Sequence, residues 1–252
     1  NCLICECLQF TGAHSEALQE AKTALESQTI NATLTARYWG AIGRVRFDEN
    51  RREEAAEAFS RGMRALQRTP DLATLSSLQH LWLISASGVA PAAMASSVRD
   101  AYRTAIRSGD PVALASFHVR LAQLEGQRGS FANAAHHLDL AESLLDRVEH
   151  VALRGIFHVN RGCVLGLIGA YAAARKNGEA AALYAEQAGY ARLSMAASAV
   201  VAHTAVAVGD LSVAESWLRR GIGIMRRLGI IEGSLFENLA SVELIRGRID
   251  NA

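Results

Sequence analysis

The feature that most restricts the fold of this chain is a short polar turn that recurs about every 40 residues. The turn residue is glycine six times and asparagine once: Gly12, Asn50, Gly88, Gly129, Gly169, Gly209 and Gly247. The residue five positions after each turn is always alanine: Ala17, Ala55, Ala93, Ala134, Ala174, Ala214 and Ala252. Self-similarity at one fixed period is typical of repeat proteins.

Both columns of the repeat have a physical cause. Glycine and asparagine tolerate the left-handed backbone that ends one helix before the next begins. Just past such a turn, a side chain larger than a methyl group would push two antiparallel helices apart. A third column, twelve residues past the turn, is small at all but one position: Ala24, Gly62, Asp100, Ala141, Ala181 and Gly221. The repeated unit is therefore predicted to be a helical hairpin.

The whole chain is predicted to be all-α. Few prolines and abundant Ala, Leu, Glu and Arg favour helix, and no alternation of period two indicates a strand. We expect one domain, a right-handed α-solenoid of about seven antiparallel hairpins with the last one incomplete. The units span roughly 1–30, 34–68, 72–108, 112–148, 151–189, 192–228 and 231–252. The second unit should have helices at Ala36–Asp48 and Glu53–Gln67, with Pro70 and Pro111 in links and Pro91 in a first helical turn.

The second unit resembles the tetratricopeptide repeat family. The matching residues are Trp39, Ile42, Gly43, Ala55, Phe59 and, slightly late, Pro70; in the first unit they are Gly12, Glu16, Ala17 and Ala24. The chain departs from the family at Arg46, where tyrosine is preferred, and at His80 and Arg161, which occupy apolar positions. The long period looks like that of bacterial regulators of the maltose-activator type, in which a solenoid lies between an ATPase module and a DNA-binding helix-turn-helix. The resemblance implies a cytoplasmic, bacterial regulatory protein.

Composition excludes several classes of protein. With 26 basic and 25 acidic side chains, the net charge of +1 gives no general attraction to nucleic acid or to an anionic membrane. Four cysteines are too few to cross-link the fold, which favours a reducing compartment, the cytoplasm. The longest apolar stretch, Met195–Val208, is shorter than the roughly 20 residues of a membrane span and predicts a buried helix. We expect no signal peptide, and further repeats or domains on either side.

No catalytic or nucleotide-binding motif occurs, so we expect neither an enzyme nor a cofactor. Cys2, Cys5 and Cys7 could hold a metal with a further ligand such as His14, but small core residues of a helix are the better interpretation. The neighbours His136 and His137 point differently on a helix and are expected to face solvent.

Arginines gather on three helix faces: Arg61, Arg64 and Arg68; Arg99, Arg103 and Arg107; and Arg219, Arg220, Arg226 and Arg227. Such faces could follow a phosphate backbone. Glu57 precedes Arg61 by four residues, and Glu215 precedes Arg219 by four, which indicates ion pairing along a solvated face instead. Binding of nucleic acid through this segment is therefore the less favoured interpretation.

The candidate binding site follows from the family resemblance, which implies that residues nine and six positions before each turn face a groove. The first column reads Ala41, Gln79, Arg120, Asn160, Val200 and Asn238, and the second Arg44, Trp82, Gln123, Cys163, His203 and Ser241. We predict a polar wall with one aromatic member: Arg44, Gln79, Trp82, Arg120, Gln123, Asn160, His203 and Asn238. It could hold an extended peptide, a carboxylate or a sugar. Alternatively, the columns are polar only because they face water, and His203 and Trp82 belong to the core.

Three functions remain open. The first is an interaction domain that binds a protein or peptide, as the sensor or docking part of a transcriptional or signalling regulator. The second is a receptor for a small-molecule effector, with Trp82, Gln79, Gln123 and Asn160 as contacts. The third is self-association through the ends of the array.

Overall fold

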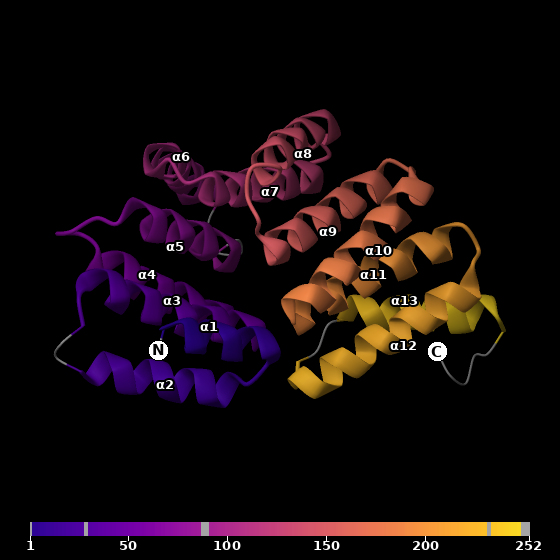
Figure 1. Cartoon of the computed structure of the whole chain (residues 1–252). Helices are drawn as coiled ribbons and strands as arrows, with labels where there is room; N and C mark the ends of the chain where they lie inside the picture. Colours follow the sequence, from indigo (N-terminus) through magenta and orange to yellow (C-terminus); the bar gives the residue numbers. More distant parts are fainter. Residues whose placement is uncertain (1, 28–29, 87–90, 231–232, 248–252) are drawn as a thin grey trace. The chain divides into compact units, whose positions relative to one another are not determined.

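The computed structural model describes residues 2–27, 30–86, 91–230 and 233–247, and in these ranges every regular element is a helix (Figure 1). The helices are α1 (Cys2–Thr11), α2 (His14–Glu26), α3 (Ala32–Asp48), α4 (Arg52–Ala65), α5 (Leu72–Ser85), α6 (Pro91–Ser108), α7 (Pro111–Gln127), α8 (Phe131–Leu145), α9 (Val151–Leu167), α10 (Tyr171–Ala188), α11 (Ala191–Ala207), α12 (Leu211–Leu228) and α13 (Gly233–Ile245). The all-α prediction is confirmed.

The predicted turns lie where helices reverse. Asn50 has φ 62° and is the one non-glycine residue with positive φ in the described part of the chain. The glycines at positions 12, 129, 169, 209 and 247 have φ between 72° and 85°, and Gly88 lies outside the described residues. A second set, Gly109, Gly189 and Gly229, has φ between 62° and 66° and joins one hairpin to the next. The sequence analysis missed this second set.

Polar side chains fix where several helices begin. The Asn31 side chain accepts from the backbone N–H of Leu34 at 2.9 Å before α3, and Asp71 accepts from Ala73 and Thr74 at 3.2 Å before α5. Each such bond satisfies a donor that a helix start leaves unpaired. Pro91 is the first residue of α6, as expected. Pro111 is the first residue of α7, so the expectation that it lies in a link was wrong.

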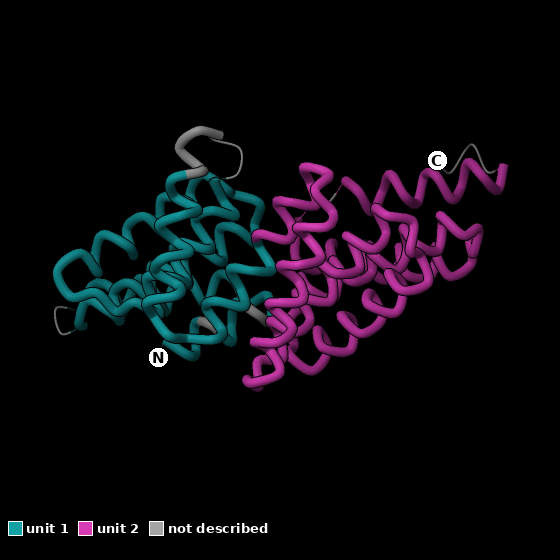
Figure 2. The backbone as a smooth tube through the Cα atoms, turned by 90° about the horizontal axis from the view of Figure 1, so that it is seen from above, with its two compact units in different colours: residues 1–120 teal, residues 121–252 magenta. Residues whose placement is uncertain are grey.

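The chain divides into two compact units, residues 1–120 and 121–252, and the division falls inside α7 (Figure 2). Within each unit consecutive helices pack together. We call the odd-numbered helices A helices and the even-numbered ones B helices. Four A helices also contact the next A helix: α1 contacts α3, α3 contacts α5, α9 contacts α11, and α11 contacts α13. This pattern is that of stacked hairpins.

The small columns lie in the core, as predicted. Five column alanines are at most 1% exposed: Ala17, Ala55, Ala134, Ala174 and Ala214. The side chains of Ala93 and Ala252 lie outside the described set. In the third column, a Cβ on Gly62 would stand 2.9 Å from Leu78 and 3.0 Å from the Ala36 carbonyl oxygen, whereas Asp100 is exposed.

In the first unit, the core is organised around Phe59, which is fully buried with Ala36, Ala55, Leu66 and Leu78. Its ring occupies the space beside Gly43 on α3, because a Cβ there would lie 2.6 Å from Phe59 Cδ1. Two residues of the family resemblance are thus in direct contact across one hairpin.

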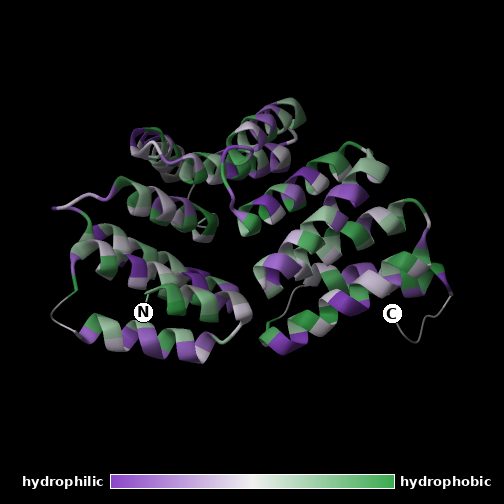
Figure 3. Cartoon of the chain, viewed as in Figure 1, coloured by the Kyte–Doolittle hydropathy of each residue, from purple (hydrophilic) through white to green (hydrophobic). Residues whose placement is uncertain are grey.

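In the second unit, α11 is the central helix and contacts α9, α10, α12 and α13. Ten of its residues are buried, which confirms that the apolar stretch is a buried helix. Figure 3 shows hydrophobic and hydrophilic residues mixed along the other helices, as expected for helices with one buried face. Within the described ranges, no helix combines the length and apolar character that crossing a membrane requires.

Candidate functional site

A cavity of the second unit lies across three A helices, and we call it the A-helix pocket. Its volume is about 400 Å³. The lining comes from α9 (Val159, Gly162, Cys163, Gly166), α11 (Arg192, Met195, Ala196, Ala199, Val200, His203, Thr204) and α13 (Ser234, Leu235, Asn238). Pockets that bind small ligands or side chains commonly have such a volume and such an apolar lining.

Small residues create the A-helix pocket. A Cβ on Gly162 would stand 2.8 Å from Val200, so this glycine lets α9 and α11 approach closely. A Cβ on Gly166, one turn later, would meet nothing within 4 Å. Gly166 therefore leaves open space that a longer side chain could fill.

Some polar groups of the pocket already form hydrogen bonds within the protein, and a ligand could use them only by breaking these bonds. The Thr204 hydroxyl already donates within α11, 2.9 Å from the Val201 carbonyl oxygen, and Asn238 Nδ2 donates to the Ser234 carbonyl oxygen at 2.7 Å. Asn238 Oδ1 and the exposed His203 ring remain as polar contacts. Cys163 is accessible but sits in a concave surrounding, and the resulting desolvation raises the pKa of its thiol.

Four members of the two predicted groove columns line this pocket: Cys163, Val200, His203 and Asn238. The predicted Asn160 is on the same helix as Cys163 but outside the lining, and its side chain donates to the Ile156 carbonyl oxygen at 2.8 Å. The two columns therefore include residues on the faces of α9, α11 and α13 that line this pocket.

In the first unit, the structure separates the predicted residues. Arg44 lines a small cavity of about 190 Å³ between α3 and α5, together with Ala73 and Ser77. Gln79 and Trp82 line another, of about 270 Å³, with residues of α4 and α6. Trp82 also packs against the core around Phe59. Arg44 and Trp82 therefore line different cavities, and Trp82 is partly buried against the core.

Arg120 does not face an open groove either. It is 5% exposed, and its guanidinium donates to the Leu83 carbonyl oxygen at 3.4 Å. Burial lowers the pKa of Arg120 to about 10, with a smaller effect from the charge of Arg52. Gln123, three residues further along α7, is exposed.

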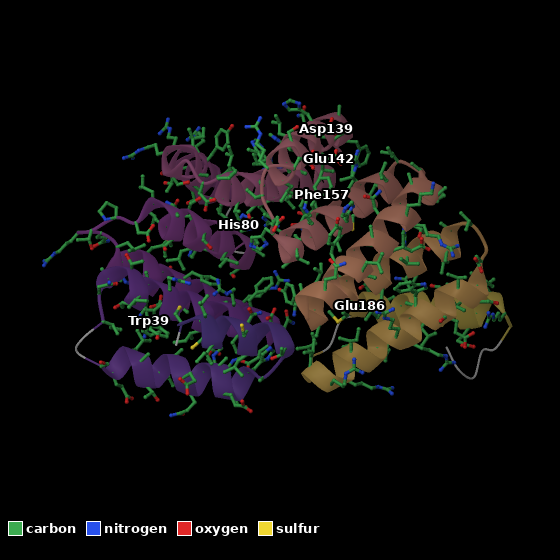
Figure 4. All side chains as sticks on the ribbon, in the orientation of Figure 1. Trp39, His80, Asp139, Glu142, Phe157 and Glu186 are labelled. Carbon is green, nitrogen blue, oxygen red and sulfur yellow. The ribbon has the colours of Figure 1, made fainter. Side chains whose placement is uncertain are left out.

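His80 is close enough to Arg120 to be affected by its charge, and it is labelled on α5 in Figure 4. Its Nδ1 is buried and has no hydrogen-bond partner among the described residues. Burial, and secondarily the Arg120 charge, lower the pKa of His80 to about 4. The ring is therefore neutral at pH 7, which explains how histidine occupies a position that is apolar in the family.

The depressed pKa of His80 predicts acid sensitivity of the first unit. Below pH about 6.5 the unfolded chain binds a proton at His80, whereas the folded chain does so only near pH 4, so stability falls as the pH falls. We expect His80→Leu to abolish about 2 kcal/mol of the stability loss between pH 7.5 and pH 5, measured by urea unfolding. His136→Leu, at an exposed histidine, should leave the loss unchanged. Equal losses in the wild type and His80→Leu would contradict the assignment.

Some arginines of these faces form ion pairs with carboxylates, as the ion-pairing interpretation predicts. Glu57 Oε1 accepts from Arg61 at 2.9 Å and from Arg64 at 3.0 Å, and Glu215 pairs with Arg219 at 2.7 Å. Arg161, the other departure from the family pattern, pairs with Glu142 of α8 at 2.8 Å. Partial exposure and this carboxylate explain why arginine is tolerated there.

The cysteines near the start of the chain face different surroundings. Cys2 and Cys5 are buried in a core cluster with Ala17 and Ala21, while Cys7 is exposed. Burial raises the pKa of the Cys5 thiol, which disfavours the thiolate that a metal needs. Among the residues that the structure describes, no three His, Cys, Asp or Glu side chains gather to form a metal site.

The sequence analysis missed the apolar and small residues of the A-helix pocket. A signal existed, since Gly162 and Gly166 are four apart on α9 and Ala196 and Ala199 three apart on α11. Small residues at this spacing lie on one helix face. The predicted site was restricted to residues of two columns, mainly polar ones, so these small residues were not included.

Solved structures with the same fold include three at low sequence identity. A Rap protein complexed with Competence and Sporulation Factor gives a TM-score of 0.68 at 15% identity, covering 92% of this chain and 63% of that one. A chain of the APC/C hetero-tetramer Cut9–Hcn1 gives 0.66 at 15%, covering 95% and 41%. BtubC (BKLC) from P. vanneervenii gives 0.56 at 17%, covering 90% and 93%.

These comparisons concern the fold, which is a tetratricopeptide-like array of helical hairpins, as predicted. The chain spans less than two thirds of the length of the first two neighbours. No family model and no curated protein sequence matches it.

Proposed function

We propose that this chain is a non-enzymatic interaction domain, and that its A-helix pocket binds a segment of a partner protein. The observation that carries the proposal is the pocket itself: about 400 Å³ of space bounded by the same face of three successive A helices. The fold neighbours support it, because two of them were solved as complexes, Rap with Competence and Sporulation Factor and Cut9 with Hcn1.

The chemistry of the pocket suits an apolar side chain presented by an extended segment. Val159, Ala196 and Ala199 are partly exposed in the lining and offer apolar contact, which is the main source of affinity in such a site. Asn238 at the edge can accept from a backbone N–H through Oδ1. These contacts would bind the segment without any chemical reaction.

The role of a sensor or docking part in a bacterial transcriptional or signalling regulator rests on the length of the repeat. Its period is close to that of the maltose-activator-type solenoids described above. We include cytoplasmic location in the same proposal.

A small-molecule effector is the second candidate. The observation in its favour is the volume of the A-helix pocket, which lies within the range of about 300–1,000 Å³ typical of small-ligand sites. A metabolite screen that raises the melting temperature of the wild type but not of a pocket-filled variant would favour this candidate.

The test of the protein-binding function is to fill the pocket with Gly166→Leu. Twelve-residue peptides selected by phage display against the wild type are labelled, and their affinities are measured by fluorescence anisotropy. The leucine occupies space that is open in the wild type, so we expect an affinity loss of at least about tenfold. Folding should not suffer, since replacing a helical glycine removes a cost of about 0.5–1 kcal/mol.

Gly223→Leu is the matched control. Gly223 is also helical and also faces open space, with only the end of the Arg227 side chain at 3.9 Å, but it lies on α12 outside the pocket lining. We expect this variant to bind the selected peptides like the wild type. If both variants bind equally well, the A-helix pocket is not the binding site.

A further inference from the structure

A second cavity, in the first unit and on B helices, is unrelated to the proposed site. We call it the Trp39 groove. Its walls are α2 and α4, its floor is α3, and its volume is about 600 Å³. Leu25, Trp39, Ile42 and Ala58 supply the apolar lining, with Glu26 and Glu53 among the charged residues. In Figure 4, Trp39 lies between α2 and the α3–α4 pair.

We propose that the Trp39 groove binds an arginine-containing basic segment of a partner protein. The groove combines an indole face, aliphatic walls and carboxylates from two different helices. An arginine side chain matches this combination, because its stem is apolar and its planar head both stacks on aromatic rings and bonds carboxylates.

The chain already places a guanidinium of its own in this groove. Arg61 of α4 lies over the Trp39 ring, with Cζ 4.9 Å from the ring centroid, and its Nε donates to Glu57 at 2.9 Å. Arg61 is half exposed, so the contact can open without breaking the core. This contact shows that a guanidinium can stack on Trp39 while it bonds Glu57. Arg61 therefore competes with any incoming arginine for the ring.

The charges of the groove are complementary to a basic segment. Glu54 and Glu57 are engaged by Arg46, Arg51, Arg61 and Arg64. Glu26 on α2 and Glu53 on α4 are exposed, and neither forms an ion pair within the described residues. Four carboxylates line the groove against Lys22, Arg46 and Arg61. Because Glu54 and Glu57 already have arginine partners, the exposed Glu26 and Glu53 are the carboxylates that would attract the guanidinium of an incoming arginine.

The experiment uses the whole chain and a fluorescein-labelled hexa-arginine peptide, with binding followed by anisotropy at low and moderate salt. Arg61→Ala uncovers the indole, so we expect it to bind the peptide at least about threefold more tightly than Arg64→Ala. Arg64 is the matched control, because it bonds the same oxygen of Glu57 and carries the same charge, but among the described residues it is Arg61 that lies over the Trp39 ring. Equal affinities for the two variants would overturn the role of Trp39.

A second comparison tests the carboxylates. The double variant Glu26→Gln/Glu53→Gln should bind hexa-arginine about tenfold more weakly than the wild type. Asp139→Asn/Glu149→Gln removes the same charge from exposed positions of the second unit and should lose less than about twofold. Equal losses would mean general charge attraction and would overturn the proposal.

Two further readouts separate this inference from its alternatives. Gly166→Leu should keep its hexa-arginine affinity, so a failure of the A-helix pocket leaves this result intact. Sedimentation of the wild type should show a monomer. A dimer that hexa-arginine dissociates, and that Glu26→Gln/Glu53→Gln abolishes, would assign the groove to a second copy of the chain and overturn the partner proposed here.

Discussion

Phe59→Ala is expected to lower the free energy of unfolding of the first unit by about 4 kcal/mol. The ring is fully buried and is the largest side chain of its core cluster, so truncation both removes apolar burial and leaves a cavity. The measurement is urea unfolding of the whole chain. Phe236→Ala is the control, because this ring on α13 is 42% exposed and its loss should cost less than about 1 kcal/mol.

The contact between Phe59 and Gly43 makes a sharper test of the same packing. Gly43→Ala alone should destabilise by about 1–3 kcal/mol, although alanine is the better helix former, since its Cβ would lie 2.6 Å from Phe59 Cδ1. Adding Phe59→Leu should make the double variant more stable than the sum of the single effects, as expected for two residues in contact. Additive effects would show that the ring does not fill the space beside Gly43.

Ala174→Leu is expected to destabilise the second unit by about 3 kcal/mol. Ala174 is the column alanine of the hairpin formed by α9 and α10, it is 0% exposed, and its carbonyl oxygen would stand 3.2 Å from a Cβ on Gly162. A leucine there must push α9 and α10 apart. The measurement is again the free energy of unfolding in urea.

The chain provides a control for this substitution at the next residue. Ala173 precedes Ala174 on the same helix and is exposed, so Ala173→Leu should change stability by less than about 0.5 kcal/mol. A similar effect at both positions would mean that the alanine column does not report close approach of the two helices.

The turns and the small columns were predictable because each depends on a local property of one residue. Positive φ favours glycine or asparagine at the turn, and Asn50 adopts φ 62° there without being glycine. Close approach restricts the choice to alanine or glycine, as at Ala55 and Gly62. Neither requirement involves the identity of a distant neighbour, so one sequence was sufficient.

The third hairpin shows why the site was harder to predict. Helix α5 ends at Ser85, three residues before the turn column, whereas α3, α9 and α11 end two residues before theirs. One residue corresponds to about 100° of rotation around a helix axis. Counting back from the turn therefore assigned Gln79 and Trp82 to the face of Arg44, while the structure places them toward α4 and α6.

Arg120 illustrates a second limit. Its column position is the same as that of Asn238, which lines the A-helix pocket, yet Arg120 is buried and bonds to a carbonyl oxygen of α5. Whether a polar residue at a given position meets water depends on the residues that pack around it. The Trp39 groove was not predicted for a related reason. Its lining comes from α2, α3 and α4, so it depends on how three helices pack.

The left-handed glycines of the second unit have a consequence for how such a protein changes in evolution. Gly169, Gly189, Gly209 and Gly229 follow one another at equal intervals, and alternate members match: φ is 81° and 79° at Gly169 and Gly209, and 62° and 65° at Gly189 and Gly229. A duplication or deletion that begins at one of these glycines and ends at the next but one joins equivalent backbone states. The gene can therefore gain or lose an entire hairpin in one event while the remaining junctions keep their geometry, and the row of A helices lengthens or shortens in whole steps.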